Sequence, residues 1–200
     1  MRLSILEAAI LLSVFSVGSG ADSTLSPADD PFYSPPSGYE SSTPGTILKS
    51  RSVPSPLVGL TYEKAYQLLY RTTSATGGAE ADVTTIIVPK GTPKDILLSY
   101  QVPEDANWVN CAPSYGLLTS NSSSNADFQT ILDLGWYLSV PDYEGPASSF
   151  TAGIKSGYST LDSVRAVLGS NNDSGIPDSV KIGLWGYSGG SIASVSRIFQ

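Results

Sequence analysis

The sequence of 200 residues contains no histidine and a single cysteine, Cys111. Histidine is the usual general base at neutral pH, so these residues cannot assemble a complete Ser-His-Asp or Cys-His site. The common zinc sites are excluded as well, because one cysteine cannot replace the missing imidazole ligands. We therefore expect no metal site, and any hydrolytic chemistry would need a base from elsewhere.

Basic residues are also scarce. The chain has 11 Lys and Arg against 18 Asp and Glu, for a net charge of −7. Nucleic-acid binding is not expected, since neutralising phosphates requires a basic surface. Hydrophobic residues make up 40% of the chain, which is enough for a globular domain with a core. The low charged fraction of 14%, together with 19 Gly and 14 Pro, is common in secreted proteins.

The N-terminus has the organisation of a secretory signal peptide. Arg2 supplies a positive charge, residues 3–17 are mostly apolar, and small residues follow at 18–21. We predict a cleaved signal peptide at 1–21 and a secreted protein; the alternative is a buried N-terminal helix. The apolar run is too short to span a bilayer, and no membrane-spanning segment is predicted. Asn121 and Asn172 each begin an N-x-S acceptor for glycosylation, which suits a secreted chain.

Residues 22–56 form a proline-rich segment that carries seven of the 14 prolines. Proline removes a backbone donor, so such a segment sustains neither a helix interior nor a central strand. We predict an extended arm that wraps the domain or is processed away. The domain itself is predicted at 57–200.

From residue 57 onward, apolar residues follow the periods of regular secondary structure. Alternating runs at 66–70 and 83–87 flank a glycine-rich turn, which predicts a β-hairpin. The other elements predicted are a short helical turn at 61–65, strands at 96–102, 136–140 and 180–185, and helices at 126–134, 151–168 and 191–199. Strands that alternate with helices imply a mainly parallel sheet, with the hairpin adding antiparallel strands at one edge. This order is that of the first half of an α/β-hydrolase.

The segment Gly186-Tyr187-Ser188-Gly189-Gly190 matches the pattern G-x-S-x-G. In this pattern the serine sits in a strained turn between a strand and a helix, which lifts its hydroxyl above the sheet. Residues two before and two after the serine crowd each other, so Gly186 and Gly190 are favoured. The N–H of Gly189, at the start of the helix, can stabilise an oxyanion. Ser188 is therefore the candidate nucleophile; the alternative is a glycine-rich turn with an exposed serine.

Two upstream segments accompany this motif in order and with consistent spacing. They are SYQVPEDA at 99–106, followed by NCAPSY at 110–115, and VPDYEGP at 140–146. Together with the serine motif they resemble the fungal secretory lipase family, from about residue 57 to the last residue. The resemblance implies an α/β-hydrolase fold and a secreted enzyme that splits triacylglycerols and other fatty acyl esters. It also implies an acyl-ester lipid as substrate, transient contact with a lipid interface and no cofactor.

The resemblance assigns roles to three of the residues. Ser188 would be the nucleophile that forms an acyl-enzyme. The backbone N–H groups of Gly189 and Asp105 would form the oxyanion hole, in agreement with a second donor from the loop after the third strand. Without the resemblance, Asp105 is better interpreted as a solvated loop carboxylate.

Three other residues have less specific roles. Cys111 resembles a family cysteine that forms a disulfide with a partner further along the chain, and these 200 residues hold no such partner; the alternative is a buried free thiol. Asp142 and Glu144 form a close acidic pair. They fit a structural turn near the pocket better than the paired carboxylates of a glycosidase.

Only 12 residues follow Ser188, whereas the acid and histidine of an α/β-hydrolase triad come after the nucleophile. The sequence is therefore interpreted as an N-terminal half-domain, truncated after the serine motif, with the strand at 180–185 lacking neighbours on one side. We expect this chain not to hydrolyse esters efficiently, although the family is one of triacylglycerol lipases. The competing hypothesis is a short secreted protein that kept the half-fold as a non-catalytic binding or structural module.

Overall fold

The structure, a computed structural model, describes residues 24–120, 122 and 124–195. The predicted signal peptide at 1–21 and the glycosylation acceptor Asn121 lie outside these residues. Within the described ranges, no helix has the length and apolar character needed to cross a membrane.

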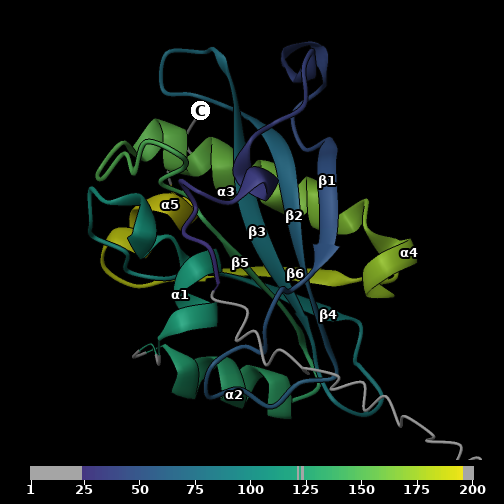
Figure 1. Cartoon of the computed structure of the whole chain (residues 1–200). Coiled ribbons are helices and arrows are strands. Elements are labelled where there is room, and N and C mark those ends of the chain that lie inside the picture. Colours follow the sequence, from purple (N-terminus) through teal and green to yellow (C-terminus); the bar gives the residue numbers. More distant parts are fainter. Residues whose placement is uncertain (1–23, 121, 123, 196–200) are drawn as a thin grey trace, which may run out of the picture.

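A six-stranded mixed sheet runs through the molecule (Figure 1). Its strands, in the spatial order β1-β2-β3-β5-β4-β6, are β1 (Ile47–Ser52), β2 (Lys64–Thr73), β3 (Ala79–Val88), β4 (Ile96–Gln101), β5 (Tyr137–Pro141) and β6 (Lys181–Gly186). Strand β4 is parallel to β5 and β6, whereas the pairs β1–β2, β2–β3 and β3–β5 are antiparallel. The predicted hairpin and later strands are confirmed. The described sheet is mixed rather than mainly parallel, because the hairpin and β1 together make three antiparallel pairs.

Helices cover both faces of this sheet (Figure 1). They are α1 (Pro113–Thr119), α2 (Asn125–Asp133), α3 (Gly153–Leu168), α4 (Asn171–Ser174) and α5 (Gly189–Val195). On one face, Leu117 of α1 and Phe128 of α2 share a buried cluster with Ile87 of β3. On the other face, Val167 of α3 shares a cluster with Ile86. Adjacent strand residues thus serve opposite faces, as the period of two requires, and both faces of the central strands are apolar.

The proline-rich segment contributes a strand that sequence analysis did not predict. Strand β1 pairs with β2 along its length, and two 3-10 turns precede it at Pro31–Tyr33 and Tyr39–Ser41. Phe32 is buried against Leu69 and its neighbours. The guanidinium of Arg51 in β1 lies 3.9 Å from the centroid of the Phe32 ring and 2.8 Å from a carboxylate oxygen of Asp30. The strand escaped prediction because its sequence, ILKSRS, is that of a polar edge strand with little apolar alternation.

Two other local predictions differ from the structure. The helical turn expected at 61–65 is wrong, because Lys64 and Ala65 already belong to β2 and pair with Val88 and Ile87 of β3. Helix α1, which follows a 3-10 turn at Val109–Cys111, is not among the helices that the sequence predicts. It is only seven residues long and contains Gly116, so its periodic signal is weak.

Strand β6 is the last strand of the sheet in the described part of the chain, with β4 as its neighbour. Its apolar residues Ile182, Leu184 and Trp185 are 42%, 39% and 55% exposed. This arrangement agrees with the expectation of a strand that lacks neighbours on one side.

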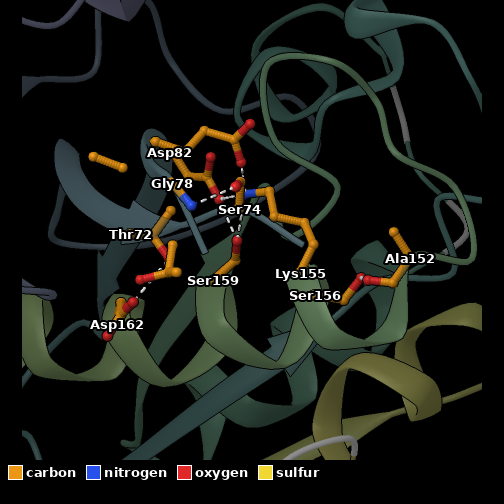
Figure 2. A network of polar contacts seen from close by, with 12 residues as sticks. Thr72, Ser74, Gly78, Asp82, Ala152, Lys155, Ser156, Ser159 and Asp162 are labelled. Carbon is orange, nitrogen blue, oxygen red and sulfur yellow. Dashed lines mark hydrogen bonds and ion pairs between the residues drawn. The ribbon is translucent and has the colours of Figure 1, made fainter. Parts of the chain in front are cut away.

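A buried network of charged groups attaches α3 to the β2–β3 hairpin (Figure 2). The ammonium group of Lys155, whose side chain is 2% exposed, lies 2.7 Å from a carboxylate oxygen of Glu80 and also pairs with Asp82. Ser159, one turn further along α3, donates a hydrogen bond to the same carboxylate of Asp82. Burial raises the pKa of Asp82, and the charge of Lys155 opposes that rise. The network therefore joins the first two turns of α3, which follow the 142–152 loop, to the hairpin.

Replacing Lys155 with methionine is expected to destabilise the protein by about 3–5 kcal/mol, because Asp82 would stay buried without its cation. Urea denaturation measures the free energy of unfolding. Lys90→Met, in the exposed turn after β3, is the control and should change it by less than about 0.5 kcal/mol. Adding Asp82→Asn to Lys155→Met should recover part of the loss. Equal effects at Lys155 and Lys90 would contradict the role of the network.

Candidate active site

The predicted elbow lies between β6 and α5. Strand β6 ends at Gly186 and α5 begins at Gly189, which leaves Tyr187 and Ser188 as the connection. Ser188 is exposed and has a φ of 53°, a value that residues other than glycine rarely adopt. The N–H and the hydroxyl of Ser191 both donate to the carbonyl of Ser188, at 3.0 and 2.6 Å. The serine is therefore held in a strained turn at the carboxyl end of a parallel strand, where α/β proteins place their sites.

Gly186 and Gly190 lie so close to neighbouring backbone atoms that no residue with a side chain would fit at either position. A Cβ on Gly186 would lie 2.2 Å from the carbonyl oxygen of Gly190, and a Cβ on Gly190 would lie 2.0 Å from the carbonyl oxygen of Gln101. Both contacts are with backbone atoms, so no side-chain rotation can relieve them. The crowding that the motif predicts is present. The second contact also presses the start of α5 against the end of β4.

The loop after β4 brings Asp105 to the elbow. Asp105 is exposed and has a φ of 47°. A Cβ on Gly189 would lie 2.2 Å from Oδ1 of Asp105, so this carboxylate lies directly against the backbone of Gly189. Far apart in the sequence, these two residues are neighbours in space. The elbow and the 102–105 loop therefore form one continuous site.

Tyr143 belongs to this site, although sequence analysis did not single it out. The residue is 2% exposed. Its hydroxyl donates to the carbonyl of Val102 at 2.7 Å and accepts from the N–H of Glu104 at 3.4 Å. The same hydroxyl lies 3.5 Å from the position that a Cβ on Gly189 would take. Its sequence signals are its place in the VPDYEGP segment at 140–146 and its position between two acidic residues, two positions after the end of β5.

Three carboxyl groups near the 102–105 loop have raised pKa values. Asp142, which is 5% exposed, accepts hydrogen bonds from the N–H and hydroxyl of Ser114, and burial raises its pKa to about 7. Burial, followed by repulsion from Asp105, raises the pKa of Glu144 to about 7. Burial and then the charges of Asp142 and Glu144 raise the pKa of Glu104 to about 9. Because Asp142 and Glu144 are both buried, they suit a structural turn and not a pair of glycosidase carboxylates.

The remaining predicted residues add no reactive group to the elbow. Cys111 is an exposed free thiol in this structure, so the alternative of a buried thiol is wrong, and the disulfide that the resemblance implies stays a prediction. It borders a cavity of about 180 Å³ that Glu104 and Phe128 also line. Asn172 is exposed on α4, where a glycan would have access. In the part of the chain that the structure describes, no group of three or more acidic, histidine or cysteine residues could hold a metal ion.

Known proteins share this sequence and geometry. A family model described as "Secretory lipase" matches residues 120–198. The chain is 40% identical to "Lipase A" from Arthroderma benhamiae over 200 residues, which cover 92% of this chain and 42% of that protein. It is 43% identical to "Trichothecene C-3 esterase" from Fusarium sporotrichioides, over 85% of this chain and 40% of that protein. The chain belongs to the secretory lipase family.

The crystal structure of Candida antarctica lipase A has the same fold. It superposes with a TM-score of 0.74 at 37% sequence identity, covering 86% of this chain and 42% of that one. The secretory lipase chain therefore has the α/β-hydrolase architecture that its sequence predicts, and the family resemblance is confirmed. The chain spans about two fifths of the length of the relatives it matches.

Replacing Gly190 with alanine is expected to destabilise the protein by about 3 kcal/mol or more, because the new Cβ would overlap the carbonyl of Gln101. Gly116→Ala in α1 is the matched control. The nearest atom to its added Cβ would be 3.9 Å away, so it should stabilise the helix by up to about 1 kcal/mol. Neither glycine has a positive φ, so an alanine at either position is free of left-handed backbone strain. A difference between the melting temperatures of the two variants then reports the steric overlap at position 190. Similar melting temperatures for the two variants would contradict the close approach.

The raised pKa of Glu104 predicts that stability falls as the pH rises. Unfolding lowers this pKa from about 9 to the ordinary 4.5, so between these values the unfolded chain binds fewer protons than the folded one. Glu104→Gln should remove this contribution and leave the variant more stable than the parent at pH 8. Glu144→Gln should remove a similar fall in stability with rising pH, one that ends near pH 7 because the pKa of Glu144 is about 7. Denaturant unfolding from pH 4 to pH 9 measures both slopes, and an unchanged slope in Glu104→Gln would overturn the assignment.

Proposed function

We propose that this chain carries the nucleophile and the oxyanion hole of a secreted serine hydrolase that acts on acyl esters, with triacylglycerols as the substrate class. One observation carries the proposal: Ser188 sits at a φ of 53° in the elbow while Asp105 lies against Gly189. Relatives named lipases and an esterase support the same chemistry. A serine hydrolase needs no cofactor.

The proposed reaction begins with attack of the Ser188 hydroxyl oxygen on the ester carbonyl carbon. The carbonyl oxygen becomes an oxyanion, and the backbone N–H groups of Gly189 and Asp105 are the proposed donors that stabilise it. A base takes the serine proton and passes it to the departing alcohol, which leaves an acyl-enzyme. Water then attacks the acyl-enzyme, the acid is released and Ser188 regains its proton.

The catalytic histidine is not among these 200 residues, since the sequence contains none. We propose that the histidine and its acidic partner are supplied by sequence outside residues 1–200. A serine without its base retains only the assistance of the oxyanion hole and of substrate binding. By itself, the chain should therefore hydrolyse esters very slowly.

The remaining aspects of the proposal concern the setting of the reaction. The predicted signal peptide, the family description and the exposed acceptor Asn172 support an extracellular protein that contacts lipid surfaces transiently. The absence of histidine favours a second candidate, a secreted binding or structural module without catalysis. The two functions differ in whether Ser188 is needed for hydrolysis of an ester substrate.

The chain of residues 1–200, expressed in a secreting host, should hydrolyse a short-chain p-nitrophenyl ester about 10⁴-fold or more below an ordinary lipase, because it lacks a base. A longer reading frame that supplies an aspartate and a histidine should be active, and Ser188→Ala should abolish that activity. Full activity of residues 1–200 would contradict the external base. An active long form that is insensitive to Ser188→Ala would contradict the nucleophile, and a stop codon after Gln200 would favour the non-catalytic module.

A further inference from the structure

We propose that Tyr143 is a positioning residue that holds the oxyanion-hole loop in register with the elbow. The inference rests on the proposed ester hydrolysis at Ser188. It assigns a role to a residue that lies on a different loop from both proposed donors. Tyr143 touches neither a substrate nor the reacting atoms; its effect passes through the backbone of residues 102–105.

The hydroxyl of Tyr143 joins two points of this short loop. It donates to the carbonyl of Val102 at 2.7 Å and accepts from the N–H of Glu104 at 3.4 Å. Both bonded groups lie within three residues of Asp105, whose N–H is a proposed donor to the oxyanion. One side-chain atom therefore determines the path of the backbone that leads into the oxyanion hole.

The restrained loop has a conformation that would otherwise relax. Asp105 has a φ of 47°, in the left-handed region, which aspartate adopts more readily than most residues but still at some cost in backbone strain. The Tyr143 hydroxyl lies 3.5 Å from the site of a Cβ on Gly189, and Oδ1 of Asp105 would lie 2.2 Å from the same Cβ. Tyr143 therefore occupies the junction of the 102–105 loop and the elbow. Loss of its hydroxyl would free the loop where the two donors must converge.

Tyr143 is itself anchored on both sides in the chain. On its N-terminal side, the N–H of Asp142 donates to the carbonyl of Val83, and the Asp142 carboxylate accepts from Ser114. On its C-terminal side, Gly145 has a φ of 71°, and a Cβ there would lie 2.6 Å from the Lys155 ammonium nitrogen. The buried network around Lys155 (Figure 2) thus abuts the loop that carries the tyrosine. These contacts make the tyrosine a rigid support for the 102–105 loop.

The tyrosine keeps its proton over the working pH range. Burial, followed by the charges of Glu144 and Glu104, raises the pKa of Tyr143 above that of free tyrosine. The hydroxyl can therefore donate to the Val102 carbonyl at neutral pH.

The test is Tyr143→Phe in the complete active protein that contains this chain. Phenylalanine fills the same space and lacks both hydrogen bonds. We expect kcat for a short-chain p-nitrophenyl ester to fall about 10- to 100-fold, somewhat less than the loss on deleting an oxyanion-hole donor. KM should change less than about twofold, because substrate binding does not use the loop directly. Hydrogen exchange of the peptide that spans residues 102–105 should become faster.

Tyr137→Phe is the matched control. Tyr137 is also buried, and its hydroxyl donates to the carbonyl of Gly175 at 3.1 Å, next to α4. Both variants should show a lower melting temperature, but Tyr137→Phe should keep the parental kcat and the parental exchange at 102–105.

Three results would overturn the proposal. They are an unchanged kcat in Tyr143→Phe, equal losses of kcat in the two variants, and a Tyr143→Phe protein that fails to fold while Tyr137→Phe folds. Ser188→Ala is assayed in parallel. If it leaves activity intact, the proposed function fails; if it abolishes activity while Tyr143→Phe does not lower kcat, only the role of Tyr143 fails.

Discussion

Backbone packed against backbone at the elbow is the constraint on which the site depends. The carbonyl of Gln101 occupies the place where any side chain at position 190 would begin, and the carbonyl of Gly190 does the same for position 186. The first turn of α5 is thereby pressed onto the ends of β4 and β6. Ser188 then has one path between strand and helix, and it takes that path at a cost of about 1–3 kcal/mol in backbone strain. The same contact brings Gly189 to the 102–105 loop.

The support beneath these loops is polar. Lys155 neutralises buried carboxylates between α3 and the hairpin, Asp142 is satisfied by Ser114, and Tyr143 bonds to the backbone of the 102–105 loop. Hydrogen bonds and ion pairs have directions, whereas apolar contacts do not, so a polar support specifies one loop geometry. Burial also keeps Glu104 protonated at neutral pH.

Individual elements show which parts of the fold the local sequence predicts and which parts it does not. The hairpin, β4, β5 and α3 were predictable because each satisfies its own period of apolar residues. Strand β1 was missed because ILKSRS has the composition of a loop and becomes a strand through its pairing with β2. Lys64 and Ala65 favoured a helical turn locally, and pairing with β3 overrode that preference. Tyr143 was missed because a single tyrosine has no pattern, and its role depends on Val102 and Glu104, about 40 positions earlier.

The sequence by itself determined the elbow, the strands and helices with a clear period of apolar residues, and the lack of a histidine to serve as base. Both kinds of feature are local and can be read from neighbouring residues. The first is the steric crowding around positions 186, 188 and 190, and the second is the spacing of apolar residues, with a period of two in strands and 3.6 in helices. Only the tertiary structure decided that Asp105 lies against Gly189, that Tyr143 bridges to the loop before Asp105, and that burial raises the pKa of Glu104. These properties depend on contacts and on desolvation between residues far apart in the chain, and folding alone brings those residues together.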